Sequence, residues 1–111
     1  MERNIMVTAE QIRQGKVFAE TAGQVMYQQI GERDACGFGW VEVYVDRTNS
    51  KQAKELIAAG FRKDYKPKCL SMWDPAGVPT QSISVKEAGA HAYAKYLQAL
   101  GLQAYGCSRL D

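Results

Sequence analysis

Gly37-Phe38-Gly39-Trp40-Val41-Glu42-Val43-Tyr44-Val45-Asp46 is the stretch of sequence that decides the fold. Its apolar residues recur with a period of two, which is the spacing of side chains along one face of a β-strand. The valines at 41, 43 and 45 share one face, and the opposite face carries Phe38, Trp40, Glu42 and Tyr44. The stretch therefore predicts a strand with one aliphatic and one aromatic face.

The residues before this strand have helical periodicity. Thr8 and Gln11 have the spacing of a capping box, and Gly31 is a typical helix end. Glycine costs about 1 kcal/mol relative to alanine inside a helix. We therefore expect either a break near Gly15 or close packing at both Gly15 and Gly23. The pattern predicts an N-terminal helix over residues 8–31.

After the strand, Asn49 and Ser50 are good N-caps for a short helix that Gly60 ends, with Phe61 folding back on its last turn. Residues 62–68 form a basic connection, and residues 69–73 have the composition of a second strand. Residues 74–77, Asp-Pro-Ala-Gly, have the chemistry of a type I turn. This turn predicts a hairpin whose returning strand is 78–83, at an edge or irregular because of Pro79.

The last third of the chain predicts a helix and a final strand. Ser84 and Glu87 have capping-box spacing, an apolar stripe follows, and Gly101 ends the helix. Residues 102–107 supply the final strand. The predicted fold class is α+β, a ferredoxin-like βαββαβ antiparallel sheet with helices on one face and an added N-terminal helix. If 78–83 is a loop, three strands and three helices remain.

Length and composition indicate a single domain with its α/β core over residues 37–108. The chain has 111 residues, of which 46% are hydrophobic and 23% charged, enough to build one buried core. No apolar run approaches the roughly 20 residues of a membrane-spanning helix. The polar start, Met1-Glu2-Arg3-Asn4, is unlike a signal peptide, so we expect no membrane partner and a cytoplasmic location, the host cytoplasm if a phage encodes the chain. The net charge of +2 favours no class of partner.

Few residues suit metal binding or catalysis. The cysteines are Cys36, Cys69 and Cys107, widely spaced, and His91 is the single histidine. A structural zinc site needs four ligands and would require them all, so we expect reduced thiols, no metal and no cofactor. His91 shares the polar side of its helix with Glu87, which favours a solvated charge row. No phosphate-binding loop, nucleophile motif or metal-ligand pair occurs, so we predict no enzyme, and a small enzyme acting through His91 is a third possibility.

The face opposite the valines and the basic connection carry the candidate binding residues. In the predicted fold the helices cover one face of the sheet, so the aromatic face must meet water, the N-terminal helix, another subunit or a ligand. Aromatic side chains stack on bases, and lysine and arginine contact phosphates. The candidate ligand-binding residues are Phe38, Trp40, Tyr44, Arg62, Lys63, Lys66, Lys68, Trp73, Tyr105 and Arg109.

The stretch from Gly37 to Val43 resembles the second sequence motif of RNA-recognition-motif domains, which reads basic-Gly-aromatic-Gly-aromatic-Val-x-aromatic. Phe38 and Trp40 occupy the stacking positions of that motif. The resemblance implies that both rings stack bases and that the glycines keep the surface flat. Cys36 stands where the motif has a basic residue, and Val43 where it has its last aromatic.

Residues 36–111 also resemble a group of small proteins, without assigned activity, that tailed bacteriophages encode. The resemblance implies a bacterial cytoplasm during infection, and a role such as inhibiting a host protein, sequestering a signal molecule or handling nucleic acid. The strings that carry it are Cys36-Gly37-Phe38-Gly39-Trp40-Val41, Trp73-Asp74-Pro75-Ala76-Gly77, Thr80-Gln81-Ser82, Lys86-Glu87-Ala88-Gly89-Ala90 and Ser108-Arg109-Leu110-Asp111.

Two functions follow from these patterns. The first is a non-catalytic binding protein that engages nucleic acid or a nucleotide-like ligand through the aromatic sheet face and its basic rim. The alternative is a protein-interaction module, a homodimer or an inhibitor of a host protein, that buries the same aromatic face. The two differ in whether the face around Phe38 and Trp40 is open, and in what covers it.

Overall fold

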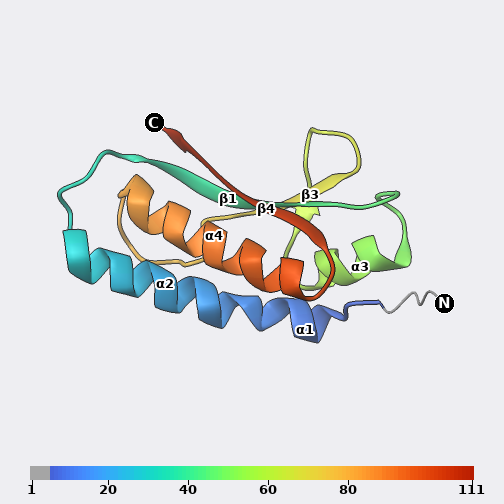
Figure 1. Cartoon of the computed structure of the whole chain (residues 1–111). Coiled ribbons are helices and arrows are strands. Elements are labelled where there is room, and N and C mark those ends of the chain that lie inside the picture. Colours follow the sequence, from blue (N-terminus) through green and yellow to red (C-terminus); the bar gives the residue numbers. More distant parts are fainter. Residues whose placement is uncertain (1–5) are drawn as a thin grey trace.

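The computed structural model describes residues 6–111 and folds them into an α+β structure, a four-stranded antiparallel sheet with helices on one face (Figure 1). The polar start at residues 1–4, which argued against a signal peptide, lies outside the described residues. In chain order the elements are α1 (Ala9–Arg13), α2 (Gly15–Ile30), β1 (Gly37–Tyr44), α3 (Lys51–Ala58), β2 (Arg62–Lys63), β3 (Cys69–Trp73), α4 (Ile83–Ala99) and β4 (Gln103–Leu110).

The strands lie in the order β2-β3-β1-β4, and each neighbouring pair is antiparallel. Strand β1 is central, and its Trp40 lies opposite Trp73 of β3 and Cys107 of β4. Helix α4 packs beneath the sheet, and α2 packs against α4 on the side away from the sheet (Figure 1). Residues 6–111 therefore form three layers, and none of their helices lies on the upper face of the sheet (Figure 1).

The period-two prediction is confirmed for residues 37–44, which form β1, whereas residues 45 and 46 lie beyond its end. Val41 and Val43 are fully buried on the helix-covered face, and Val45 is partly buried at its margin. Around them pack the side chains of the other elements, chiefly Ile12, Leu56, Phe61, Leu70, Tyr93 and Leu97. Burial of aliphatic and aromatic side chains on one face of the sheet is what holds the helices to it.

The N-terminal helix is broken, and both of its glycines pack closely. The Thr8 hydroxyl accepts from the Gln11 N–H in the predicted capping box, and α1 ends at Arg13, with Gln14 alone between it and α2. A Cβ on Gly15 would lie 2.5 Å from the Tyr93 ring, and a Cβ on Gly23 would lie 2.7 Å from Ala76 Cβ. The helix therefore shows both expected features, a break near Gly15 and close packing at the two glycines. The absence of side chains at both glycines lets α2 approach its neighbours.

The short helix α3 follows its sequence signals. Ser50 caps it by accepting from the Ala53 N–H, and Gly60 follows it with φ +111°, a conformation that favours glycine. The N–H of Phe61 then donates to Leu56 O, and the Phe61 side chain is buried. These contacts confirm the predicted stop and the predicted fold-back.

The hairpin was predicted on the wrong side of β3. Residues 78–83 are not a strand, although Gly77 N–H does close the predicted turn onto Asp74 O. Val78 instead packs with Ala76 and Val85 against α2, in a small second cluster of buried side chains. The hairpin partner of β3 is β2, which precedes it in the chain and lies inside the segment predicted to be a basic connection.

The ends of the last two elements also differ from the prediction. Helix α4 is capped by Ser82, whose hydroxyl accepts from the Val85 N–H, so it begins at Ile83 rather than after Ser84. Strand β4 runs on past Cys107 to Leu110, because β1 offers pairing partners back to Gly37. Within residues 6–111, no helix combines the length and the apolar character needed to cross a membrane.

Candidate binding face of the sheet

Five aromatic side chains stand on the sheet face that has no helix. Directly paired residues of neighbouring strands share a face, so the register places Trp73 and Tyr105 beside the even-numbered residues of β1. The aromatic residues brought together are Phe38, Trp40, Tyr44, Trp73 and Tyr105.

The N-terminal helix does not cover these rings. It packs on α4, which lies beyond the opposite face of the sheet (Figure 1). Trp73 is 48% exposed and Tyr105 46% exposed, while Phe38 and Trp40 are half-buried among their neighbours. Of the covers considered for this face, the N-terminal helix is therefore ruled out.

The rings form two groups. Trp40 and Trp73 are stacked, with ring centroids 4.5 Å apart and planes at 12°, and Phe38 meets Trp73 edge to face at 5.9 Å. Tyr44 and Tyr105 make a second edge-to-face pair at 5.9 Å. Because Trp40 and Trp73 cover one face of each other, only the remaining ring surface of Trp73 is offered to a ligand.

Glu42 lies between the two groups and is 4% exposed. Its carboxylate accepts from Trp40 Nε1 at 2.9 Å, from the Tyr44 hydroxyl at 2.9 Å and from Lys66 Nζ at 2.7 Å. Burial alone would raise the pKa of Glu42, but these hydrogen bonds outweigh it and lower the pKa below its ordinary value. The same carboxylate raises the pKa of Lys66 and raises the pKa of Tyr44 to about 12. Lys66 is therefore charged and already paired.

Within residues 6–111, Arg62 and Lys63 form no ion pair that would compete with a ligand. Both are exposed on β2 and line a hollow of about 440 Å³ beside Trp73. Arg62 pairs with Ser71 and shares the open face, whereas Lys63 pairs with Leu70 and points toward the opposite face at the edge of the sheet. The other lining residues are Gly60, Asp64, Tyr65, Ser71 and Met72. The hollow therefore joins an aromatic wall to a cationic rim, a combination that the sequence suggested only as separate features.

A second cationic position lies at Phe38. The Arg109 guanidinium carbon is 5.2 Å from the Phe38 ring centroid and Lys86 Nζ is 5.8 Å from it, both within cation–π range. The sequence did not indicate Lys86 as a binding residue. Lys86 lies in the first turns of α4, a helix that was expected to cover the valine face of the sheet. Lys68 is exposed at the start of β3, with φ +58°. The basic residues thus form separate positions around the aromatic face.

The glycines of β1 serve the opposite face from the one expected. A Cβ on Gly39 would lie 2.6 Å from Lys86 O, and a Cβ on Gly37 would lie 2.7 Å from Ile83. Both positions therefore face α4, and their missing side chains let that helix lie against the strand. The expectation that these glycines flatten the aromatic surface is wrong, because alternate residues of a strand point to opposite faces.

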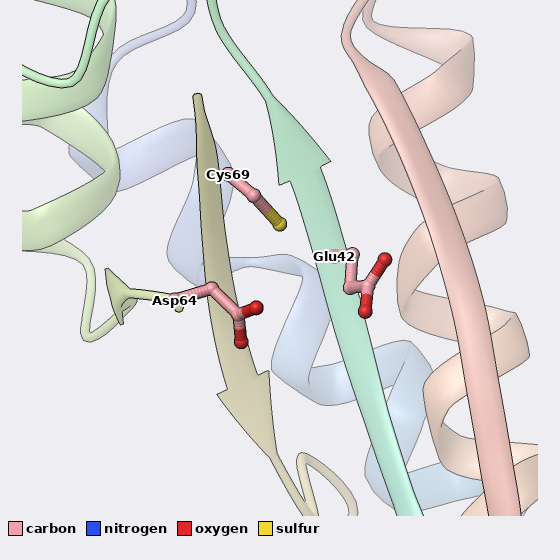
Figure 2. A group of neighbouring side chains, drawn as sticks. All are labelled: Glu42, Asp64 and Cys69. Atoms are coloured by element: carbon pink, nitrogen blue, oxygen red, sulfur yellow. The ribbon is translucent and has the colours of Figure 1, made fainter. Parts of the chain in front are cut away.

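A group of side chains with metal-ligand chemistry also lies on this face. Figure 2 shows Glu42, Asp64 and Cys69 converging, and their ligand atoms lie within 4.8 Å of one another. Glu42 already binds the Lys66 ammonium, and Asp64 accepts from the Ser71 hydroxyl at 3.0 Å and from the Lys66 N–H at 3.1 Å. Burial raises the pKa of Cys69 to about 11, which keeps the thiol protonated. The positive charge bound here is the chain's own lysine.

The remaining candidates for chemistry are dispersed. The cysteines are free, with Cys36 exposed, Cys69 buried and Cys107 half-buried. His91 Nε2 lies 3.9 Å from Glu87 Oε2, and both side chains are well exposed. Glu87 also accepts from the Ser108 hydroxyl at 2.7 Å. This is the helix-surface charge row that the spacing indicated.

Comparison of the chain with protein-family models, with curated proteins and with solved structures gave no match. The two resemblances therefore rest on the quoted strings alone. The open face, with its aromatic hollow and cationic rim, is the feature from which a function can be argued.

Proposed function

We propose that the protein is a non-catalytic binding protein that takes a nucleotide or a short single-stranded nucleic acid on the open sheet face. The observation that carries the proposal is the hollow of about 440 Å³ beside the exposed Trp73 ring, with Arg62 and Lys63 on its rim. Small-ligand sites commonly have volumes of about 300–1,000 Å³. A base stacked on Trp73 would leave its phosphate within reach of Arg62, which shares the open face with Ser71, and of Lys63, which lines the hollow from the edge strand β2.

Each part of the hollow supplies a different interaction. Stacking of a base on an aromatic side chain contributes about 1–3 kcal/mol. Contacts from Arg62 and Lys63 to phosphate release counterions, so their contribution falls as salt rises. The pairing of Lys66 with Glu42 removes one of the expected cations from this role and fixes the loop that bears Tyr65 and Asp64.

We also propose that the core is a ferredoxin-like unit. Its elements run β1, α3, β2, β3, α4 and β4, which is the βαββαβ sequence of elements that defines that class. Antiparallel pairing throughout the sheet, with helices on a single face, supports the assignment. In such a unit the uncovered face is the broad surface available for a ligand.

The test is a titration of fluorescently labelled single-stranded oligonucleotides and of labelled ATP, followed by anisotropy at low and moderate salt. We expect Trp73→Ala to weaken binding about tenfold, within the range of lost stacking. Combined Arg62→Ala and Lys63→Ala should weaken it mainly at low salt. Lys95→Ala is the matched control, since Lys95 is exposed on α4 away from the sheet. Absence of binding by the unmodified protein, or equal affinity of all variants, would contradict the proposal.

The second candidate function is a protein-interaction module that buries the same face. The observation that favours it is the composition of the face, because tryptophan, tyrosine and arginine dominate the energetics of protein interfaces. Trp73→Glu distinguishes the two. If the protein is an interaction module, sedimentation detects a protein complex of the unmodified chain that Trp73→Glu abolishes. The unmodified chain then binds no oligonucleotide.

A further inference from the structure

Strand β4 leaves one full edge of the sheet unpaired. All eight of its residues, Gln103–Leu110, pair with β1, and no strand within residues 6–111 lies on its other side. The opposite edge of the sheet, β2, has only two residues. The two edges therefore differ greatly in what they offer to another strand.

The hydrogen bonds of the sheet show which β4 groups point outward. Asp111 N–H donates to Cys36 O, Val45 N–H donates to Lys68 O, and Asp74 N–H donates to Gly39 O. Because hydrogen-bonded and non-hydrogen-bonded pairs alternate along antiparallel strands, the odd residues of β4 bond to β1. The outward N–H and C=O groups then belong to Ala104, Gly106, Ser108 and Leu110. Gln98 Nε2 donates to Ala104 O from outside the ladder, in agreement with this assignment.

Nothing in the sequence of β4 blocks this edge. Proteins usually protect a free edge with proline, lysine, a bulge or a very short strand. Strand β4 contains no proline or lysine, and its register with β1 is continuous over eight pairs. Its outward groups at Gly106 and Ser108 therefore form a ready template for another strand.

We propose that the partner is a second copy of this chain, with the two β4 strands paired antiparallel about a two-fold axis at Cys107. In this register Gly106 bonds to Ser108 of the second copy, and Ser108 to its Gly106. A two-fold axis makes every contact occur twice. The sheet of the dimer is then continuous, and the two open faces lie side by side.

The side chains of β4 complement each other in this register. Tyr105 lies opposite Arg109 of the second copy, a cation–π pairing, and Gln103 lies opposite its Asp111. Cys107 lies opposite Cys107 of the second copy. None of these pairs brings two like charges together. An axis at Arg109 would place the two guanidinium groups opposite each other, which is unfavourable. The charges therefore disfavour an axis at Arg109, and the pairing of Tyr105 with Arg109 favours the axis at Cys107.

Sedimentation equilibrium of the full chain tests the dimer, and this inference does not depend on the proposed ligand. We expect a monomer–dimer equilibrium whose dissociation constant rises at least tenfold in Tyr105→Lys, because lysine would then face Arg109 of the second copy. The double variant Tyr105→Arg with Arg109→Tyr restores the pairing and should recover the dimer. Trp73→Lys is the matched control on the same face but off the edge, and it should leave the dimer unchanged.

Cross-linking tests the register. Non-hydrogen-bonded pairs have Cα atoms about 4.5 Å apart, within the range of about 4.4–6.8 Å for a disulfide. Diamide, which takes up the two electrons and two protons of a thiol pair, should join Cys107 to Cys107 in a Cys36→Ser and Cys69→Ser background. Cys107→Ser should abolish the product. A monomer at all concentrations, a dimer unaffected by Tyr105→Lys, or a dimer without the Cys107 cross-link would each overturn the proposal.

Discussion

The ammonium of Lys66 lies 2.7 Å from Glu42 Oε2, and this ion pair fastens the loop between β2 and β3 to the middle of the open sheet face. Glu42 is nearly fully buried, whereas the Lys66 side chain is 37% exposed. Solvent therefore screens this ion pair only from the side of Lys66. The ion pair fixes the loop that forms one wall of the hollow beside Trp73.

Removing the carboxylate should destabilise the fold. In Glu42→Ala, the Trp40 indole N–H and the Lys66 ammonium lose their acceptor, and we expect the free energy of unfolding to fall by about 1–3 kcal/mol. Urea denaturation measures the change. Glu20→Ala, at an exposed position of α2, is the control and should change stability by less than about 0.5 kcal/mol. Equal stability of the two variants would show that the pair contributes nothing.

The free energy of unfolding should fall at low pH because the Asp34 carboxylate becomes protonated. The Ser82 hydroxyl donates to its carboxylate at 2.6 Å and the Ser84 N–H donates at 2.9 Å, and these bonds lower the pKa of Asp34 from 3.8 to about 2. A group with a depressed pKa stabilises the fold above its unfolded-state pKa, and the stabilisation is lost as the pH falls through its folded-state pKa. The Asp34 contribution should therefore disappear between about pH 4 and pH 2.

Thermal melts across this acid range provide the measurement. Asp34→Asn keeps an acceptor oxygen but has no titrating charge, so its melting temperature should depend less steeply on pH than that of the unmodified protein. Identical slopes for the two proteins would assign the acid sensitivity to other carboxylates.

A side chain at Gly39 should disrupt the packing of α4 on the sheet. A Cβ there would lie 2.6 Å from Lys86 O and 2.7 Å from its carbonyl carbon, so backbone must move to admit it. Overpacking of this kind costs about 1–3 kcal/mol. We expect Gly39→Ala to lower the urea midpoint, and Gln103→Ala, at an exposed position of β4, to leave it nearly unchanged. A tolerated alanine at 39 would mean that α4 can shift freely.

The hydroxyl of Tyr93 should stabilise the N-terminal helices. It donates to Ile12 O at 2.7 Å in a buried position, and Tyr93→Phe leaves that carbonyl without its partner, at a cost of about 1–3 kcal/mol. The hydroxyl of Tyr96 makes a similar bond to Gln11 O at the surface, where water can replace it. Tyr96→Phe is therefore the matched control. Equal effects of the two changes on the melting temperature would contradict the role assigned to burial.

The parts of the fold that were predicted correctly carry local signals. The period of two in β1, the cap at Ser50 and the return of Phe61 after Gly60 depend on neighbours within a few residues. The class of the fold followed from these elements. The break at Gln14 was likewise anticipated from the cost of glycine in a helix.

The errors arose where distant contacts decide the structure. Strand β2 has only two exposed residues, so no period can reveal it, and its existence depends on the free edge of β3. Val78 packs in a cluster against α2 instead of pairing with β3, and this removes the expected returning strand. The pairing of Lys66 with Glu42 spans 24 residues, and a basic loop alone does not indicate it.

The two faces of β1 can change independently of each other. Gly37 and Gly39 must remain free of side chains for α4 to fit, whereas the alternate positions, such as Phe38 and Trp40, point to the face on which none of the described helices packs (Figure 1). A library that randomises Phe38, Trp40 and Tyr44 and keeps Glu42 and the glycines would therefore alter what the surface recognises while leaving the helical layers in place. Apart from Glu42, the strand thus separates the residues that maintain the architecture from those that are free to evolve new specificity.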